Sequence, residues 1–203
     1  MKITVVGGSR GTGAELARQA LAAGHEVTVV SRSGSGPEGS RALAADATSA
    51  ASLREAVSGA DAVVVTVGAA RGTKKQRTAV TKAVVEAMAA AGARRLVVQS
   101  SAGAGESAQH LPAVLRGLMR LALASAIKDH EEQEAVARDS GLDWTVVRPS
   151  GLTDQPATGA WRVLEASESG TVRGTISRAD LAAFMLGLLA DTSAVEKAFS
   201  ISS

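Results

Sequence analysis

The chain has 203 residues, which is enough for one domain with its own hydrophobic core and too few for two large domains. Its 22 basic and 20 acidic residues nearly cancel, for a formal net charge of +2, which argues against a nucleic-acid partner. The chain has no cysteine, which excludes disulfides, thiolate metal ligands and a cysteine nucleophile. It has no tyrosine either, so the commonest phenolic acid is missing from any mechanism.

The N-terminal segment MKITVVGG enters a strand pattern at once. Its apolar run is too short for the core of a signal peptide or for a membrane span. We therefore expect a cytoplasmic protein without a membrane partner. His25 and His110 have no second ligand at metal-binding spacing, so we predict no metal site.

The first half of the chain alternates predicted strands and helices. A β-branched run over residues 2–6 precedes the turn GGSRGTG and a helix that Gly24 ends. Residues 31–40 read as a polar loop. The other elements predicted here are strands at 26–30, 41–45 and 61–67, and helices at 49–57 and 74–91.

The second half continues the alternation. After a strand at 95–99 come two serines and a Gly-rich loop, and residues 111–140 read as helical with a break near Ser125. A strand at 143–147 ends at Arg148 and Pro149, and the segment 150–175 is irregular and faces the substrate. The last elements are a helix at 178–190 and a strand at 198–201. This order predicts an α/β fold with a doubly wound parallel sheet, a Rossmann fold, in one domain over 1–203.

Gly7, Gly11 and Gly13 follow the first strand with the spacing G-x-x-x-G-x-G and lead into a helix. At such a junction, backbone N–H groups and the helix dipole can hold a pyrophosphate. A glycine trio alone is weak, but a strand precedes it and a helix follows it. The sequence therefore predicts a dinucleotide site.

The end of the second strand distinguishes between the two dinucleotides, because an acidic residue there would bind the 2′-OH of NAD. This chain has Ser31 and Arg32 instead, and Arg10 of the glycine turn can reach the same place. Two guanidinium groups suit a 2′-phosphate. We therefore predict NADP(H), with a merely solvated Arg32 as the alternative.

Two further residues are predicted near the adenosine. Asp46 follows the third strand and could accept a hydrogen bond from the adenine amino group, or could cap the helix that starts near Thr48. Gly68 follows the fourth strand, where a glycine would let the backbone approach the ribose.

Two segments are more distinctive than the glycine turn: SGLDWTVVRPSGLTDQPATGAW at 140–161 and ISRADLAAFMLGLL at 176–189. With the turn, they resemble the atypical short-chain dehydrogenases/reductases, in the NAD(P)-binding NmrA-like group, and most of all its biliverdin reductase B or NADPH flavin reductase branch. The resemblance spans nearly the whole chain. The run DQPATGAW is its most specific part, because it is not a general feature of Rossmann proteins.

The resemblance implies roles for single residues. Ser101 matches the active-site serine after the fifth strand, and His130 falls where flavin reductases place a histidine near the substrate. Gly151 and Leu152 lie on the loop that would flank the nicotinamide. The implied cofactor contacts are Gly7, Ser9, Gly11, Thr12 and Gly13 at the phosphates, Arg32 at the 2′-phosphate and Asp46 at the adenine.

Two positions depart from the family pattern. Arg10 stands where the atypical group usually has its middle glycine, so the turn resembles that of ordinary short-chain dehydrogenases. Gly151 stands where the biliverdin reductase pattern has a histidine, which predicts a differently shaped substrate pocket.

The missing tyrosine directs the predicted chemistry. Ordinary short-chain dehydrogenases protonate a carbonyl with a tyrosine, whereas here Ser101 could only hydrogen-bond an oxygen and His130 could supply a proton. A planar conjugated acceptor such as a flavin, a quinone or a linear tetrapyrrole takes a hydride and draws its proton from water. We therefore predict an NADPH-dependent reductase of a small-molecule acceptor, with FMN or riboflavin first.

Several alternatives stay open. The chain could be a non-catalytic NADP(H) sensor of the NmrA kind or, less favoured, a sugar-nucleotide epimerase or dehydratase. His130 could be an exposed, salt-bridged residue, Ser101 a turn former, and Lys128 a surface cation rather than a ribose contact. We expect a monomer or a weak homodimer.

An apolar stripe at helical spacing has three possible roles. It could line the substrate cleft, act as a lid or pack as core, and Gly103 and Gly105 could permit loop closure. The stripe consists of Leu111, Val114, Leu115, Leu118, Met119 and Ala122.

Overall fold

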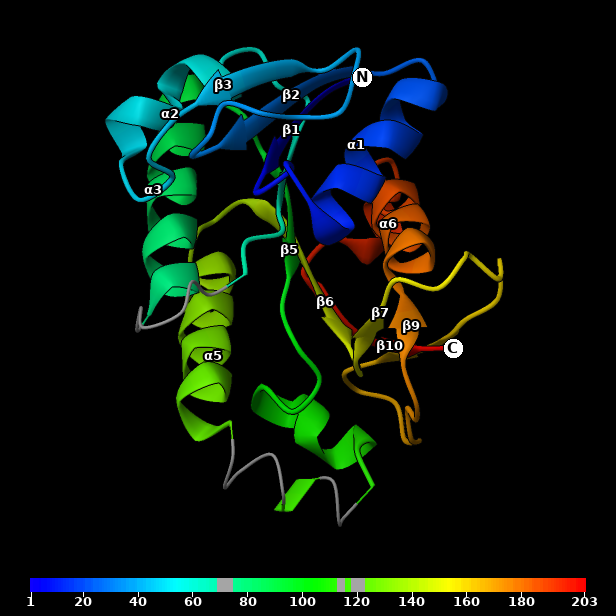
Figure 1. Cartoon of the computed structure of the whole chain (residues 1–203). Coiled ribbons are helices and arrows are strands. Elements are labelled where there is room, and N and C mark those ends of the chain that lie inside the picture. Colours follow the sequence, from blue (N-terminus) through cyan, green and yellow to red (C-terminus); the bar gives the residue numbers. More distant parts are fainter. Residues whose placement is uncertain (69–74, 113–115, 118–122) are drawn as a thin grey trace.

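The computed structural model describes residues 1–68, 75–112, 116–117 and 123–203 (Figure 1). At its centre lies an eight-stranded sheet with the strand order β3-β2-β1-β4-β5-β6-β10-β8. All neighbours in it are parallel except β10 and β8, which are antiparallel. The strands are β1 (Lys2–Val6), β2 (Glu26–Ser31), β3 (Arg41–Ala44), β4 (Ala62–Val65), β5 (Arg95–Gln99), β6 (Asp143–Pro149), β8 (Arg162–Glu165) and β10 (Lys197–Ser202).

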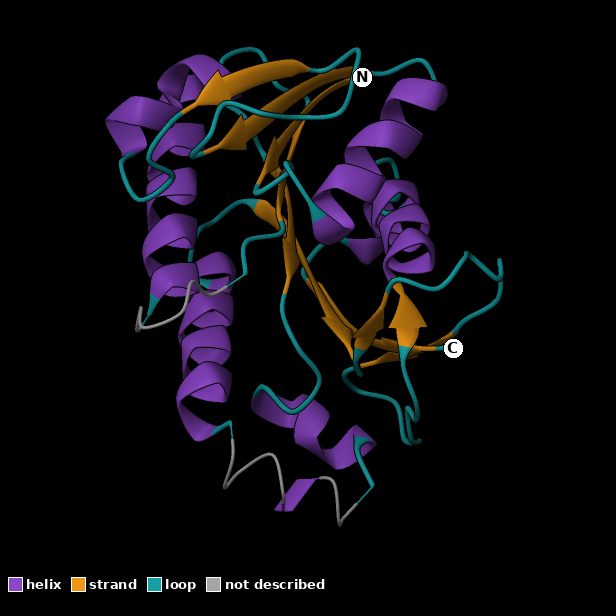
Figure 2. Ribbon diagram, viewed as in Figure 1, coloured by secondary structure: helices purple, strands orange, loops and turns teal. Residues whose placement is uncertain are grey.

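Helices cover both faces of this sheet, as Figure 2 shows. One layer contains α1 and α6, and the other contains α2, α3 and α5. The predicted doubly wound parallel sheet is therefore confirmed. The helices are α1 (Gly11–Ala22), α2 (Ala50–Val57), α3 (Gln76–Ala91), α5 (Ala124–Arg138) and α6 (Arg178–Gly187), with short 3₁₀ turns η1 (Gly105–His110) and η2 (Thr192–Ala194).

Strand β4 shows why the sequence folds into these layers. Its four residues are fully buried, because the sheet is covered on both faces. Val63 and Val65 pack into the α2, α3 and α5 layer, whereas Ala62 and Val64 pack into the α1 and α6 layer. This alternation follows from the period of two in a strand and explains the unbroken apolar run.

The helix ends predicted at Gly24 and Gly92 are confirmed. Gly24 follows α1 with a φ of 81°, and Gly92 caps α3 with a φ of 72°, a left-handed conformation that glycine adopts at little cost. Helix α2 begins after Ser49, whose side chain accepts a hydrogen bond from the Ser52 N–H.

Three predictions for the second half are corrected. In the stretch predicted to be helical over 111–140 with a break near Ser125, residues 116–117 are helical and α5 begins at Ala124, whereas 113–115 and 118–122 lie outside the described residues. A 3₁₀ turn, η1, occupies the Gly-rich loop. Strand β6 continues through Arg148 to Pro149, because a terminal proline needs no ladder donor and its carbonyl still accepts the Ala102 N–H at 3.0 Å.

The segment predicted to be irregular, 150–175, contains two strands. Strand β7 (Leu152–Thr153) pairs in parallel with β9 (Ile176–Ser177), and β8 forms the edge of the main sheet. The two segments that carry the family resemblance meet here, because the buried Asp180 carboxylate accepts hydrogen bonds from the N–H groups of Thr158 and Gly159, both at 2.9 Å. This contact fixes the DQPATGAW run onto α6.

Of the apolar stripe, the described residues include Leu111. Leu111 is buried with Ala102, Leu164 and Val172, so it belongs to a small core. The rest of the stripe, Val114, Leu115, Leu118, Met119 and Ala122, lies outside the described residues. Among the helices that the structure describes, none has the length and apolar character to cross a membrane.

Candidate dinucleotide and acceptor site

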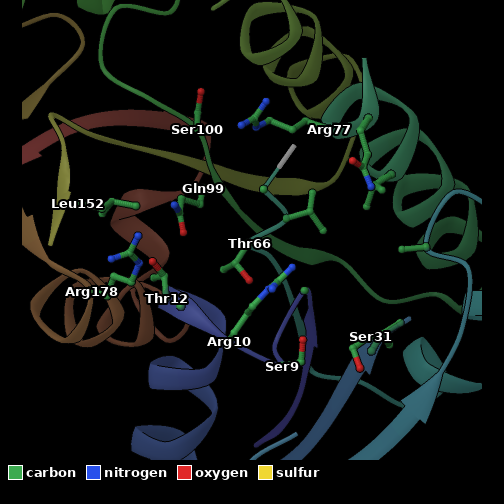
Figure 3. Close-up of a pocket in the computed structure, with 18 of the residues that line it drawn as sticks. Ser9, Arg10, Thr12, Ser31, Thr66, Arg77, Gln99, Ser100, Leu152 and Arg178 are labelled. Atoms are coloured by element: carbon green, nitrogen blue, oxygen red, sulfur yellow. The ribbon is translucent and has the colours of Figure 1, made fainter. Parts of the chain in front are cut away.

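A cleft of about 730 Å³ lies at the carboxyl ends of the parallel strands, where doubly wound sheets bind their ligands (Figure 3). Two residues named in the sequence analysis do not line this cleft: Gly13, which is buried, and Lys128, which is exposed. The structure brings most of the predicted site residues together in this cleft: Gly7, Ser9, Arg10, Gly11, Thr12, Arg32, Asp46, Gly68, Ser101, His130, Gly151 and Leu152.

The glycine turn joins β1 to α1 and is fitted to a diphosphate by its backbone. A Cβ on Gly13 would lie 2.6 Å from the Gly7 carbonyl oxygen and 2.9 Å from the Gly8 Cα, so only glycine lets the helix pack this closely. Gly7 has a φ of 94°. No side chain caps α1, which leaves the N–H groups of its first turn free to bind an anion.

Beside the turn, a second, open hollow of about 540 Å³ is lined by Ser9, Arg10, Arg32, Ser33 and Ser35. Arg10 and Arg32 are exposed, and neither forms a salt bridge within the part of the chain that the structure describes. Ser31 orders the loop, because its hydroxyl donates to the Ser35 carbonyl at 2.9 Å. The hollow thus has two cations and several hydroxyl groups, which suits a phosphate.

Asp46 lines the cleft and also orders its own loop. Its Oδ1 accepts hydrogen bonds from the Thr48 backbone N–H at 2.9 Å and from the Thr48 hydroxyl at 2.7 Å. These bonds lower the pKa of Asp46 and keep the carboxylate ionised. The cap of α2 is Ser49, so the alternative role of Asp46 as helix cap is wrong.

At the far end of the cleft, two serines follow β5. The Ser101 hydroxyl donates to the Ala102 carbonyl at 3.2 Å. The Ser100 hydroxyl is more constrained, because it donates to Glu134 Oε1 at 2.5 Å and lies 3.4 Å from His130 Nδ1. Ser100 also lines the cleft, and sequence reasoning missed it.

His130 lies on α5 and is only 8% exposed, so its alternative as an exposed, salt-bridged residue is wrong. Burial, and then the positive charge of Arg77, lower the pKa of His130 to about 4. The imidazole is therefore neutral at pH 7. It can hydrogen-bond a ligand, but it cannot serve there as an imidazolium acid.

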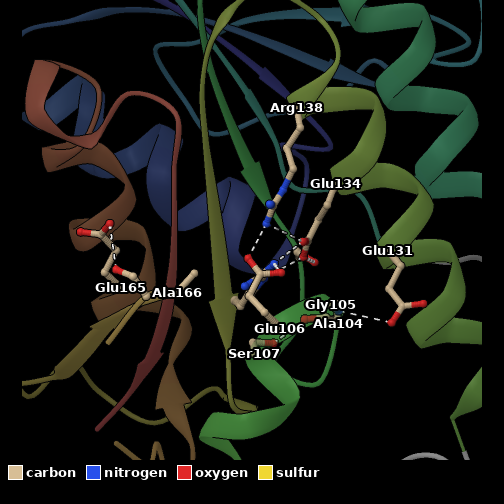
Figure 4. A network of polar contacts seen from close by, with 12 residues as sticks. Ala104, Gly105, Glu106, Ser107, Glu131, Glu134, Arg138, Glu165 and Ala166 are labelled. Carbon is tan, nitrogen blue, oxygen red and sulfur yellow. Dashed lines mark hydrogen bonds and ion pairs between the residues drawn. The ribbon is translucent and has the colours of Figure 1, made fainter. Parts of the chain in front are cut away.

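Glu134, which accepts the Ser100 hydrogen bond, belongs to an ion-pair network with Glu106 and Arg138 (Figure 4). Arg148 is fully buried on β6, and its Nε donates to Glu134 Oε1 at 2.9 Å. The same guanidinium lies 3.2 Å from Glu106 Oε2, and Arg138 binds Glu106 Oε1 at 2.6 Å. Burial opposes ionisation of Glu106, but the two arginines lower its pKa to about 2. The network thus ties η1 and α5 to the floor of the cleft.

Further cleft residues were not found from the sequence. Gln99 Oε1 is buried with no hydrogen-bond partner among the described residues, so a ligand donor would satisfy it. Arg178 of α6 lies against the glycine turn, 3.4 Å from where a Cβ on Gly11 would be, and its Nη1 lies 2.7 Å from Asp154 Oδ1. Arg77 of α3 lines the cleft near Ser100 (Figure 3). Arg77 is distant in sequence from every motif, so motif spacing gave no signal for it, whereas Gln99 directly precedes the two serines and Arg178 lies within the distinctive segment 176–189.

In the described ranges, no group of three or more acidic or histidine side chains is arranged to hold a metal ion. His110 is fully buried and links η1 to β10, with its Nδ1 2.8 Å from the Ser200 hydroxyl.

Comparison with known proteins identifies relatives in sequence and in fold. Among curated proteins, a Bacillus subtilis protein described as an uncharacterized sugar epimerase, YhfK, is 27% identical over 154 residues, which are 73% of this chain and 66% of that protein. The reductase ChuY from Escherichia coli O157:H7 is 24% identical, with a TM-score of 0.83, and the match covers 100% of this chain and 97% of that chain.

A short-chain dehydrogenase/reductase from Veillonella parvula, solved in complex with NADP, is 18% identical with a TM-score of 0.85, over 100% of this chain and 94% of that one. At these identities the solved structures show a shared fold. The model of the NAD(P)H-binding family matches residues 7–192, from the glycine turn to the end of α6 and beyond. The chain therefore belongs to the NAD(P)H-binding family.

Proposed function

We propose that the protein is an NADPH-dependent reductase that transfers a hydride to a planar conjugated acceptor, with a flavin as the first substrate, a quinone as the second and a linear tetrapyrrole as a third. Within its family we place it in the NmrA-like group, near the biliverdin reductase B or NADPH flavin reductase branch, on the residues of the DQPATGAW run.

The choice of NADPH over NADH rests on the hollow beside the glycine turn. Arg10 and Arg32 bring two unpaired cations to the end of β2, and no acidic residue stands there to bind a free 2′-OH. The glycine turn and the first turn of α1 would hold the diphosphate, and Gln99 Oε1 would accept a hydrogen bond from the nicotinamide half.

The choice of acceptor rests on one observation: no side chain that lines the described cleft beside Ser100 is a good acid at neutral pH. The chain has no tyrosine, and His130 is held in its neutral form. An unactivated ketone needs a proton donor as the hydride arrives, whereas a flavin or quinone spreads the charge over its rings. A site without a good acid therefore favours a flavin or a quinone over an unactivated ketone.

NADPH supplies the hydride when it is bound, and one proton from water completes the reduction, so the products are NADP⁺ and the dihydro form of the acceptor. The protein contributes orientation. Ser100 is fixed by Glu134, and Ser101 stands next to it, so that two hydroxyl groups can hold acceptor or nicotinamide oxygens. Gly151 and Leu152 also line the cleft and bring no polar side chain to it.

Two relatives bear on the proposal. ChuY is described as an anaerobilin reductase, which supports a reductase activity on this fold. YhfK is described as a sugar epimerase, but the matched region is 66% of its length, and this chain lacks a tyrosine to serve such a reaction. We keep the reductase as the proposed activity.

Steady-state oxidation of NADPH with FMN, riboflavin and a soluble naphthoquinone tests the proposal. We expect turnover with at least one of these acceptors and a preference for NADPH over NADH. Tight NADPH binding without turnover of any acceptor would contradict it and favour a redox sensor. Conversion of a sugar nucleotide would support an epimerase instead.

A further inference from the structure

One cation at the acceptor end of the cleft has no role in holding the dinucleotide as proposed above. Arg77 is the second residue of α3, and its side chain is 14% exposed. Figure 3 shows its side chain extending toward the part of the cleft where Ser100 lies, away from Ser31. Its charge also acts on His130, whose pKa it lowers. Arg77 therefore lies where the acceptor, rather than the adenosine, would bind.

Most of the donors of this guanidinium are unused. Its Nη1 lies 3.3 Å from Asp129 Oδ2, the one carboxylate that it pairs with in the described structure. Asp129 is already occupied, because its Oδ1 accepts hydrogen bonds from the Thr78 N–H at 3.1 Å and the Thr78 hydroxyl at 2.8 Å. Its Oδ2 also accepts the Arg77 backbone N–H at 3.2 Å. Asp129 thus anchors Arg77, which lines the cleft.

The other acidic groups nearby have partners of their own. Glu134 is bound to Arg148 and Ser100, and Glu132 pairs with Lys75 at 2.9 Å. Asp154, which also lines the cleft, pairs with Arg178. None of these carboxylates pairs with Arg77, so among the described residues Asp129 is its one carboxylate partner and the other guanidinium nitrogens are left to bind an anion from outside.

We propose that Arg77 binds an anionic substituent of the acceptor, a phosphate or a carboxylate, and that the substrate class is therefore an anionic conjugated molecule rather than a neutral one. A planar guanidinium suits both anions, because its parallel N–H groups match two oxygens. The inference rests on the proposed function, since it assumes that an acceptor occupies this end of the cleft.

The test compares matched acceptors that differ in one charge. FMN and riboflavin share their ring system and differ by a phosphate, and a naphthoquinone with and without a carboxylate substituent provides the second pair. Dissociation constants are measured by fluorescence or absorbance on the protein saturated with NADP⁺, so that the glycine turn is already filled, and KM values are measured with NADPH.

The variant Arg77→Met removes the charge and keeps a long side chain, and Arg77→Lys keeps the charge without the fork. Lys75→Met is the matched control, because Lys75 lies two residues earlier and outside the cleft. We expect the wild type to bind the anionic member of a pair about tenfold or more tightly than the neutral one. This preference should vanish in Arg77→Met, persist in part in Arg77→Lys and remain intact in Lys75→Met.

Equal binding of charged and neutral acceptors by the wild type would overturn the assignment. So would an Arg77→Met variant that loses affinity for NADPH while it keeps the preference between acceptors. If flavins are reduced but the preference is absent, the inference fails and the reductase stands. If charge-selective binding depends on Arg77 but nothing is reduced, the reductase fails and the anion site stands.

Discussion

The two ends of the cleft are built in different ways. At the proposed adenosine end, the glycine turn offers free backbone N–H groups and glycines whose places a side chain would block. At the proposed acceptor end, Ser100 directly after β5, His130 and Glu134 of α5 and Arg148 of β6 form one buried polar network. A substitution that adds atoms to the glycine turn should therefore disturb the first end. A substitution that removes a charge from the buried network should disturb the second.

The largest effect is expected at the acceptor end. Glu134→Gln leaves the buried Arg148 guanidinium with Glu106 as its remaining partner, so the free energy of unfolding should fall by about 3 kcal/mol. Urea unfolding measures it. Glu55→Gln is the control, because Glu55 pairs with Arg41 on the surface, and its loss should cost less than about 1 kcal/mol. Similar losses in both variants would contradict a buried network that supports the fold.

The next effect concerns the adenosine end. In Gly13→Ala the new methyl group would press on Gly7, Gly8 and the Thr66 hydroxyl, so we expect a loss of about 1 to 3 kcal/mol in stability and weaker NADPH binding. Gly187→Ala is the control, because Gly187 ends α6 with nothing within 4 Å of an added Cβ. Thermal unfolding and a fluorescence titration compare the two. Normal binding by Gly13→Ala would remove the argument for a backbone-built cradle.

A pH effect follows from His130, whose pKa is lowered from 6.5 to about 4 in the fold. Between these values the unfolded chain binds more protons than the native protein, so stability falls as the pH falls. The contribution of His130 is fully present above pH 6.5 and should decrease by about 2 kcal/mol by pH 4.5. Urea unfolding of the wild type and of His130→Gln over this range isolates it, since the variant lacks the titrating ring. Parallel pH profiles would show that the ring is not buried as described.

The smallest effect is one of selectivity. Arg32→Ala should weaken NADPH binding about tenfold and leave NADH binding unchanged, because only the 2′-phosphate would contact this side chain. Arg41→Ala, a change at the edge strand β3 outside the cleft, should alter neither constant. An equal loss for both nucleotides would mean that Arg32 acts on the fold of the loop and not on the phosphate.

The adenosine end could be read from the sequence because its parts are consecutive. The first strand, the glycines and the following helix lie within residues 2–22, and local rules connect them. The same holds for the helix ends at Gly24 and Gly92. Arg10 and Arg32 are further apart in the chain, but both follow strands that pair in register, so parallel pairing predicted their proximity.

The acceptor end could be read only in part. The family resemblance pointed to Ser101 and His130, and both line the cleft, but the resemblance said nothing of Ser100 or Arg77. Arg77 depends on Asp129, which is far away in the sequence, for its anchoring. Strand β8 was missed for a similar reason, since the four residues RVLE have no alternating pattern and form a strand only because β10 offers them an edge.

The place of β10 in the sheet has a consequence for biosynthesis. Residues 197–202 fill an interior position between β6 and β8, and Ser200 holds His110 of η1. Synthesis therefore has to reach residues 197–202, well after the glycine turn, before β6 and β8 can be joined in the sheet. Until then β6 lacks its neighbour β10, and exposed strand edges of this kind favour aggregation of a nascent chain.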